Sequence, residues 1–392
     1  MQKIIFYNNI SADNYNDNSF GTEGKENEGN TPNRIAILHS LTEQINHLIK
    51  KEKRVFILAD KKLKDYYKLF GGAEIIEIEC SEQNKTLSTV EIIIEKLLKS
   101  EADRETLLIG FGGGITTDIC GFTGSIYKRG IRFASIPTTL LAQCDAAIGG
   151  KNGVNFGTLK NIIGTITTPQ WILISPLFLK TLPDRELRNG FAEIVKTFII
   201  FDQKAYSDAI ELFSRLNKKM VSGKKIDLQE VEIEKIVEKC SNFKLSIVEK
   251  DLYETGERRV LNLGHTFAHA IESCLRENKT ECRGTGLVTD ISHGEAVAIG
   301  IIYAAKIAER LGLAEENLAG KLESDFCSAG LPTSAAQLSL SPQKIFEAIT
   351  NDKKREGDKI HLILPKSIGN VLDVPIEIDK LQEIANDLCK FK

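Results

Sequence analysis

The stretch TLLIGFGGGITTD, residues 106–118, decides the fold class of this chain. Residues 106–111 form an apolar run typical of a buried parallel strand, and glycines 112–114 follow it directly before an apolar helix. Glycines at such a turn let backbone N–H groups approach a pyrophosphate at the helix N-terminus. Because Thr117 stands where a third glycine of the dinucleotide fingerprint would come, the glycines alone fit a plain tight turn equally well. Asp118, a carboxylate inside an apolar helix, needs a partner and so favours a bound cofactor.

Apolar runs on both sides of this turn extend the pattern to a doubly wound α/β sheet. Helices are expected at 35–50 and 88–100, and strands at 54–60, 73–79, 131–136 and 171–174. Thr138 and Thr139 follow one of these strands, at the edge where open α/β sheets bind ligands. The polar stretch 11–33 has almost no aliphatic residues, which predicts a mobile loop.

The second half of the chain has a mostly helical period that begins after Thr181-Leu182-Pro183. At 392 residues the chain is too long for one ordinary core. We therefore predict two domains: a Rossmann-like α/β domain over residues 1–180 and an all-α domain over residues 181–392. A short strand at 360–364 is the one expected exception.

Composition excludes several classes of partner. The chain is 42% hydrophobic and 27% charged, and its net charge of −3 with dispersed lysines and arginines argues against nucleic acid. The N-terminus lacks the apolar core of a secretory signal, and the longest apolar runs are half a membrane span, so no membrane association is expected. The eight cysteines form no C-x-x-C pair, which favours reduced thiols in the cytoplasm.

Three of the six histidines lie within residues 265–293. His265 and His269 share one face of a predicted helix, and His293 precedes a second apolar helix. A lone histidine more often caps or packs a helix, but three together favour a metal, since catalytic zinc usually takes three protein ligands. Glu193, an acid in an apolar helix, is the candidate for the missing ligand, although an intrahelical pair with Lys196 would also account for it.

Several cations follow small residues in the way that suits an anionic substrate. Lys151 and Lys160 are expected on a helix and loop after Asp145, and a basic run occupies 352–355. Any single lysine is usually a solvated surface charge, and Asp145 alone could be a helix cap. Arg258 and Asn262 lie at helical spacing from His265 and His269, so these side chains could converge on one pocket.

Together these motifs resemble those of the 3-dehydroquinate synthase family, in the family's order over about residues 80–370. The resemblance rests on GFGGGITTDICGF, YKRGIRF, IPTTLLAQCDAAIGGKNGVN, KNIIG, FLKTLPDRE, GFAEIVK, LNLGHTFAHAIE, HGEAVAIG and NDKK. It implies a Rossmann-like NAD domain joined to a helical metal-binding domain, and a homodimer. It also implies bound NAD+, one divalent zinc or cobalt ion, and conversion of 3-deoxy-D-arabino-heptulosonate 7-phosphate to 3-dehydroquinate and phosphate in the shikimate pathway.

The resemblance further implies a role for each matched position. The metal ligands are Glu193, His265 and His293, so His269 instead supports proton transfer near the substrate phosphate. The catalytic set is Lys196, His269, Asn262, Asp145, Glu254 and Lys151. The cofactor set is Asp60, Glu82, Lys85, Gly114, Ile115, Thr116, Thr117, Asp118, Thr138, Thr139, Lys151, Lys160, Phe178, Leu179, Lys180 and Thr181. The substrate set is Arg129, Asn161, Lys244, Arg258, Lys353 and Lys354, and Arg129 is expected to reach across the dimer interface.

Small departures and three alternatives remain. Thr117, Ala146-Ala147 and Ala268 replace residues common in the family, and the segment 274–291 is longer than usual. Cyclases that make 2-deoxy-scyllo-inosose or act on sedoheptulose 7-phosphate would share the cofactor and metal, but the retained Gly-Gly-Lys segment and basic residues favour a carboxylated substrate. A metal-dependent polyol dehydrogenase would release NADH. A non-catalytic paralogue would not need the Glu193 set.

Overall fold

The computed structural model of this chain describes most of its length. The described residues are 3–6, 34–157, 159–223, 233–281, 291–338, 340–351 and 359–390. The polar stretch 11–33, the central part of 274–291, Lys353 and Lys354 lie outside them. The chain divides into two compact units: Met1–Thr138 with Gly150–Pro176, and Thr139–Gly149 with Leu177–Lys392.

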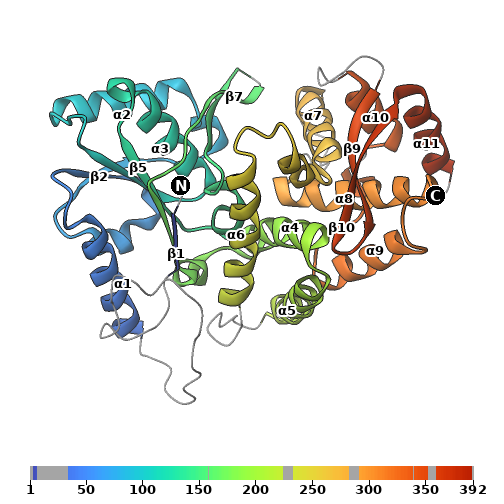
Figure 1. The fold of residues 1–392 in the computed structure, drawn as a ribbon, viewed down its shortest axis with the longest axis horizontal. Coiled ribbons are helices and arrows are strands. Elements are labelled where there is room, and N and C mark those ends of the chain that lie inside the picture. Colours follow the sequence, from blue (N-terminus) through green and yellow to red (C-terminus); the bar gives the residue numbers. More distant parts are fainter. Residues whose placement is uncertain are drawn as a thin grey trace. The chain divides into compact units, whose positions relative to one another are not determined.

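The first unit is built on a parallel sheet of six described strands in the order β1-β8-β5-β4-β2-β3 (Figure 1). The strands are β1 (Lys3–Phe6), β2 (Val55–Asp60), β3 (Glu74–Ile78), β4 (Leu107–Gly112), β5 (Arg132–Pro137) and β8 (Trp171–Ile174). β4 is buried throughout, as its apolar run predicts. The strand order reverses between β2 and β4, so ligands are expected at the carboxyl ends of these two strands.

Helices pack on this sheet through apolar stripes. The helices are α1 (Arg34–Ile49), α2 (Leu87–Lys99) and α3 (Gly114–Ile126). Phe56, Leu58, Leu108 and Ile119 belong to the core that α2 and α3 share with the strands. The predicted helices at 35–50 and 88–100 are confirmed to within one residue at each end.

An antiparallel hairpin lies against α3. It consists of β6 (Lys151–Phe156) and β7 (Leu159–Ile166). A Cβ at Gly121 of α3 would lie 1.9 Å from Asn152 Oδ1, so only glycine lets β6 approach this closely. The prediction of helix and loop around Lys151 and Lys160 is therefore wrong, because the alternation of this short segment is masked by its glycines and polar residues.

The second unit is helical, as predicted. Its described helices are α4 (Asp184–Phe201), α5 (Gln203–Val221), α6 (Ile233–Lys250), α7 (His265–Glu281), α8 (His293–Arg310), α9 (Leu318–Ser328), α10 (Pro342–Asn351) and α11 (Ile378–Lys390). α8 is buried along almost its whole length and packs against α4 and α7. This packing brings together the two histidine-bearing helices and the helix that carries Glu193.

One hairpin interrupts the helical unit, so the expectation of an all-α domain needs correction. β9 (Lys359–Ser367) and β10 (Asn370–Glu377) pair antiparallel, and β9 packs on α8 while β10 contacts α4. The strand expected at 360–364 is confirmed and is longer than its apolar run suggested. No helix among the described residues is long and apolar enough to cross a membrane.

Candidate functional site

A row of alternating charges runs through the second unit. Lys244 Nζ lies 2.5 Å from Asp145 Oδ1, and Asp145 Oδ1 lies 3.9 Å from Lys196 Nζ. Lys196 Nζ in turn lies 2.5 Å from Glu193 Oε2. These side chains come from α6, from the helical turn Ala142–Ala146 and from α4. Buried charges persist when each has an opposite partner, and this row provides one for every member.

Glu193 faces two histidines at the end of this row. Glu193 Oε1 lies 3.7 Å from His265 Nε2 and 3.6 Å from His293 Nε2. The three ligand atoms all lie within 4.8 Å of one another. The Glu193 side chain is only 1% exposed, and its Oε1 has no hydrogen-bond partner among the described residues. A buried carboxylate oxygen left in this way calls for a cation.

The geometry of these three side chains fits a metal ion. Two ligands about 2.1 Å from a tetrahedral zinc ion stand about 3.4 Å apart. The observed separations of 3.6 and 3.7 Å are close to this value and too long for direct hydrogen bonds. One carboxylate and two imidazoles are also a donor set that catalytic zinc uses with a position left open. The predicted combination of Glu193, His265 and His293 is thus assembled in the structure.

Charges near these groups shift their protonation. Burial lowers the pKa of His265 well below its ordinary value, and nearby Lys196 lowers it further, so His265 is neutral. Burial would raise the pKa of Asp145, but Lys244 and Lys196 outweigh it and hold this pKa well below its usual range. Burial likewise opposes the charge on Lys196, yet Glu193 and Asp145 raise its pKa above the ordinary value. Asp145 and Lys196 are therefore a fixed anion and a fixed cation at neutral pH.

The start of α8 is tied to α4, and this joint sets the place of His293. Ser292 and Glu295 form a capping box at the helix N-terminus. The backbone N–H of Gly294 donates to Asn189 Oδ1 at 2.7 Å, and a Cβ at Gly294 would lie 2.1 Å from Asn189 O. Arg185 of α4 also pairs with Glu295 at 3.0 Å. The motif His293-Gly294-Glu295 is thus a helix start fitted to α4, the helix that presents Glu193.

A second polar group adjoins α7. Arg258 and Asn262 lie on the 3-10 helix Glu257–Asn262 rather than on an extension of α7. Asn262 Nδ2 donates to Glu254 Oε1 at 2.6 Å, and Arg258 Nη2 donates to Gly149 O at 3.2 Å. The predicted side chains of Glu254, Arg258 and Asn262 are therefore brought together. Arg258 is buried, which suits a cation kept for a specific anion.

His269 and Glu272 lie on α7, close to the proposed metal ligands His265 and His293. The ring centroids of His269 and His265 are 5.8 Å apart, and those of His269 and His293 are 6.4 Å apart. Glu272 Oε1 lies 3.5 Å from His293 Nδ1. Sequence reasoning did not assign Glu272. The signal was its position: residues three, four and seven apart share one helix face, and Glu272 follows His265 by seven and His269 by three.

In the first unit, Lys85 joins two of the predicted residues. Lys85 Nζ lies 2.5 Å from Asp118 Oδ2 and 2.5 Å from Asn161 Oδ1. Asp118 therefore has a side-chain partner within the protein, whereas the sequence suggested cofactor hydroxyls or backbone amides. Asn161, expected with the substrate residues, lies on β7 and accepts from Lys85, a residue of the predicted cofactor set. Its φ of 53° is a left-handed conformation, which is uncommon outside glycine and marks a constrained position.

The glycine turn between β4 and α3 is as tight as predicted. A Cβ at Gly112 would lie 2.2 Å from Thr116 Oγ1, and Gly113 caps the helix without a side chain. Thr117 Oγ1 donates to Gly114 O at 3.0 Å, so threonine is accommodated where a glycine was expected. The first N–H groups of α3 lie at this turn, and such a helix N-terminus attracts phosphate.

The remaining predicted residues occupy varied surroundings. Asp60 ends β2 and accepts from Lys62 N at 3.0 Å, and Glu82 Oε2 accepts from Asn155 Nδ2 at 3.0 Å. Thr138 is buried and follows β5. The other described members of the predicted sets are Arg129, Thr139, Lys151, Lys160 and residues of the turn Pro176–Thr181, in which Phe178 and Leu179 are buried. Lys353 and Lys354 lie outside the described residues.

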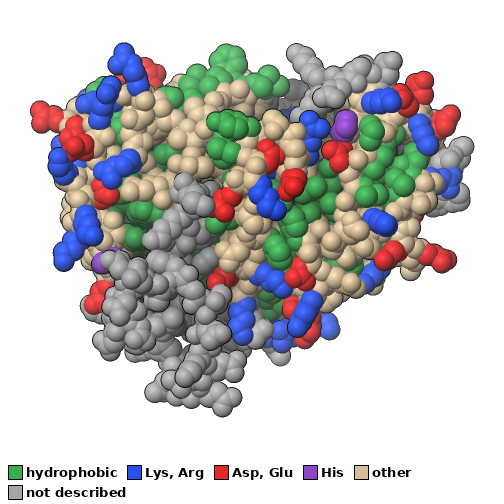
Figure 2. All heavy atoms as spheres, viewed as in Figure 1, with side chains coloured by type: hydrophobic (Ala, Val, Ile, Leu, Met, Phe, Trp, Pro, Cys, Tyr) green, Lys and Arg blue, Asp and Glu red, His purple; other side chains and the backbone are tan. Residues whose placement is uncertain are grey.

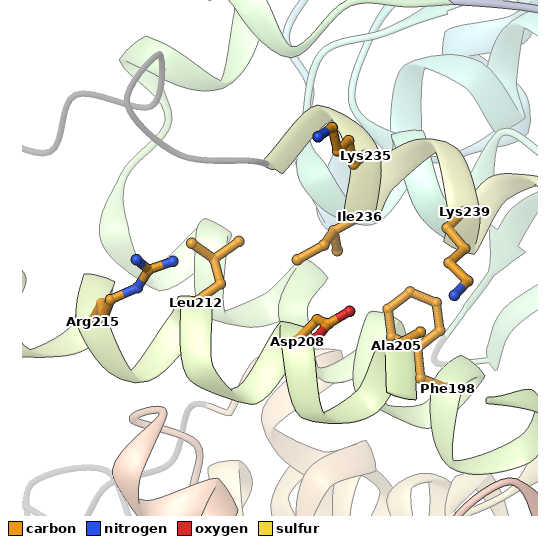
Figure 3. A pocket seen from close by; sticks show the side chains of 8 residues that line it. All are labelled: Phe198, Ala205, Asp208, Leu212, Arg215, Lys235, Ile236 and Lys239. Carbon is orange, nitrogen blue, oxygen red and sulfur yellow. The ribbon is translucent and has the colours of Figure 1, made fainter. Parts of the chain in front are cut away.

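A hollow of about 120 Å³ lies elsewhere in the second unit (Figure 3). Phe198, Leu212 and Ile236 give it an apolar wall, and its charged side chains are Asp208, Arg215, Lys235 and Lys239. Lys239 already pairs with Asp202 at 2.8 Å. None of the residues in the predicted sets lines this hollow, so it is separate from Glu193, His265 and His293.

Comparison with known proteins gives the same family for both parts of the chain. Residues 75–189 match the family model "3-dehydroquinate synthase N-terminal", and residues 190–355 match "3-dehydroquinate synthase C-terminal". A 3-dehydroquinate synthase of Campylobacter concisus is 41% identical over 319 residues, which cover 81% of this chain and 84% of that protein. One from Buchnera aphidicola is 41% identical over 318 residues, with the same shares covered.

Solved structures share the fold at lower identity. A 2-deoxy-scyllo-inosose synthase complexed with carbaglucose-6-phosphate, NAD+ and Co2+ has a TM-score of 0.72 and 25% identity, covering 88% of this chain and 94% of that one. A 2-epi-5-epi-valiolone synthase from Streptomyces hygroscopicus with NAD+ and Zn2+ has a TM-score of 0.68 and 26% identity, covering 86% and 91%. A probable glycerol dehydrogenase from Sinorhizobium meliloti, 17% identical with a TM-score of 0.58, shares the fold alone.

Proposed function

Since this chain belongs to the 3-dehydroquinate synthase family and is a 3-dehydroquinate synthase, a lyase, we propose how its own residues carry out the reaction. The substrate is 3-deoxy-D-arabino-heptulosonate 7-phosphate, and the products are 3-dehydroquinate and phosphate. The observation that carries the proposal is the group formed by buried Glu193 and half-buried His265 and His293, next to the paired cations Lys196 and Lys244. A single site must bind a carboxylate and a phosphate, and Lys244 and Arg258 are buried cations suited to the carboxylate.

The proposed cofactors are NAD+ and one zinc or cobalt ion. NAD+ is assigned to the first unit, with its pyrophosphate at the glycine turn before α3 and its hydroxyls near Asp118 and Lys85. The metal is assigned to Glu193, His265 and His293. When bound, these groups would supply hydride exchange and Lewis-acid polarisation of substrate oxygens. The structures of a 2-deoxy-scyllo-inosose synthase with NAD+ and Co2+ and of a 2-epi-5-epi-valiolone synthase with NAD+ and Zn2+ support the choice of these cofactors.

The chain's own side chains bind and orient the substrate in this proposal. Lys244 and Arg258 are buried cations that suit the substrate carboxylate. Lys151 and Asn161, together with the 353–354 pair, are assigned to the phosphate. Lys196 and Asp145, a fixed cation and anion, orient hydroxyls beside the triad. Glu254, Asn262 and His269 form the proton-transfer group, since Asn262 already donates to Glu254 and His269 lies next to both histidine ligands.

We also propose a homodimer in which Arg129 serves the partner's site. Phe156, Leu159 and Ile162 of the β6–β7 hairpin are each more than half exposed. Ile126, which precedes Arg129 by three residues, is 40% exposed. Figure 2 shows hydrophobic side chains gathered where Figure 1 draws the end of this hairpin. Exposed apolar clusters of this kind mark protein contacts. Arg129 itself is held at a φ of 67°, a strained conformation that favours a specific task. Cys80 and Cys327 are free thiols rather than disulfides, which suits the proposed cytoplasmic location.

The test is a turnover assay with limiting cofactor. Wild-type protein and His265→Ala are given the heptulosonate phosphate, trace NAD+ and either Zn2+ or Co2+, and phosphate and dehydroquinate are measured. We expect many turnovers per NAD+ without NADH build-up, and loss of turnover in His265→Ala. No turnover with metal and NAD+ bound would point to a cyclase for an uncarboxylated sugar phosphate. Stoichiometric NADH from a simple polyol would mean a dehydrogenase.

A further inference from the structure

Glu272 is a buried carboxylate placed directly behind one of the proposed metal ligands. Its Oε1 lies 3.5 Å from His293 Nδ1, whereas His293 Nε2 faces Glu193 Oε1 at 3.6 Å. The two ring nitrogens of His293 therefore face two different carboxylates. Glu272 lies on α7, the helix that also carries His265. This helix therefore supplies one histidine of the triad and the carboxylate behind the other.

We propose that Glu272 is a positioning residue that keeps the His293 proton on Nδ1 and directs the Nε2 lone pair at the metal. The inference rests on the proposed metal site and goes beyond it, because Glu272 is not itself a ligand. It predicts that metal affinity depends on a residue that does not touch the ion. Carboxylates behind ligating histidines act in this way in other metal sites.

The chemistry of the two groups selects this tautomer. A neutral imidazole has one N–H donor and one acceptor nitrogen, and an ionised carboxylate can only accept. Glu272 can therefore hold only the Nδ1–H form of neutral His293, and this form leaves Nε2 free to bind a cation. The reverse tautomer would place a lone pair against the carboxylate and a proton in the metal position.

The other histidine of the triad is arranged in the same sense. His265 Nδ1 lies 3.3 Å from the carbonyl oxygen of Leu263, which also can only accept. Both imidazoles thus have an acceptor behind Nδ1 and direct Nε2 toward Glu193 Oε1. A backbone carbonyl supports His265, and a replaceable side chain supports His293, so the proposal can be tested by substitution at position 272.

The experiment measures metal affinity rather than turnover. Metal-free wild type, Glu272→Ala and Glu272→Gln are titrated with Zn2+ against a competing chelator at one pH, after circular dichroism has established that each is folded. We expect Zn2+ affinity to fall about 10- to 100-fold in Glu272→Ala. Glu272→Gln should fall several-fold, because its amide oxygen still accepts but its charge is gone. Glu309→Gln is the matched control: Glu309 lies on α8 and accepts from Ala319 N at 2.9 Å, and its loss should leave Zn2+ affinity unchanged.

A spectroscopic measurement separates positioning from general loss of structure. In Co2+-loaded wild type, the Nδ1–H protons of His265 and His293 should give two paramagnetically shifted proton signals that exchange slowly with water. Glu272→Ala at saturating Co2+ should keep one signal and lose the other or exchange it much faster. A variant that was merely less stable would keep both signals once loaded.

The outcomes distinguish this inference from the proposed function. If wild type binds no Zn2+ or Co2+, the metal site itself fails. If wild type binds and both Glu272 variants match it in affinity and in their Co2+ signals, the positioning role is overturned. If Glu272→Ala does not fold, Glu272→Gln decides alone, since an affinity equal to wild type in that variant also overturns the role.

Discussion

The residue Gly294, next to His293, has no room for a side chain at the contact between α8 and α4. A Cβ at this position would lie 2.1 Å from the backbone oxygen of Asn189, so α8 or α4 would have to move. We predict that Gly294→Ala lowers the free energy of unfolding by about 1–3 kcal/mol, the usual cost of overpacking. It should also weaken Zn2+ binding, because His293 is the adjacent residue. Urea unfolding and chelator competition measure the two effects.

Gly72→Ala is the control for this substitution. Gly72 is exposed, and a Cβ at this position would meet no atom within 4 Å beyond its chain neighbours, so the unfolding free energy should stay within about 0.5 kcal/mol of wild type. If Gly294→Ala is as stable as Gly72→Ala and binds Zn2+ normally, the joint between α4 and α8 does not set the position of His293.

Single residues also show what a sequence reveals about such a site. His265, His293 and Glu193 could be singled out because histidines are rare in this chain and Glu193 is an acid in an apolar helix. The contact of Asn161 with Lys85 and that of Glu272 with His293 could not, because each depends on how two separate elements pack. Pairwise contacts between elements lie outside any local pattern, whereas charge in an apolar run is local.

At the scale of elements, strands and helices with long apolar periods could be predicted to within a residue or two, and the β6–β7 hairpin could not. Helices α1 and α2 and strands β2 to β5 follow such periods. The hairpin holds Gly153, Gly157 and Gly164 and few buried residues, so its stability comes from pairing and from its fit to α3. The turn before α7 is similar: Gly264, with a φ of 78°, ends the helical spacing that Arg258 and His265 suggested.

The contact between α5 and α9 makes the free energy of unfolding depend on pH in the alkaline range. Tyr206 Oη of α5 donates to Asp325 Oδ2 of α9 at 2.9 Å, and burial together with Asp325 raises the pKa of Tyr206 well above its ordinary value. An unfolded tyrosine loses its proton near pH 10, so above this pH the folded state binds more protons and stability falls. We predict that Tyr206→Phe is less stable by about 1–2 kcal/mol at pH 8. This difference should shrink by about 1 kcal/mol at pH 11, because only wild type loses the Tyr206 contribution.

Urea unfolding of both proteins at pH 8 and pH 11 measures this difference, and other titrating groups cancel because both proteins contain them. Tyr253→Phe is the control, since Tyr253 is 67% exposed, and its unfolding free energy should match wild type at both pH values. An equal Tyr206→Phe deficit at pH 8 and pH 11 would show that the proton of Tyr206 does not link α5 to α9.

At the scale of the whole molecule, the proposed homodimer makes one chain's activity depend on the other's Arg129. Arg129→Ala and Lys196→Ala should each be nearly inactive, one lacking the residue given to the partner and the other a residue of its own site. A mixed dimer would hold one complete site, made of the intact Lys196 in the first chain and the intact Arg129 from the second. The other site of the mixed dimer, in the second chain, would lack both Lys196 and the partner's Arg129.

We therefore predict that mixed dimers of Arg129→Ala and Lys196→Ala, isolated through two different tags, recover about half of the wild-type turnover per dimer. Unselected one-to-one mixtures should recover about one quarter, because random pairing makes half of the dimers mixed. Ile162→Asp should prevent the recovery by placing a charge in the exposed apolar hairpin. If the isolated mixed dimers turn over no faster than their parents, Arg129 does not act across an interface. If Ile162→Asp chains stay dimeric in sedimentation, the hairpin is not that interface, and the exposed side chains of β6 and β7 need another partner.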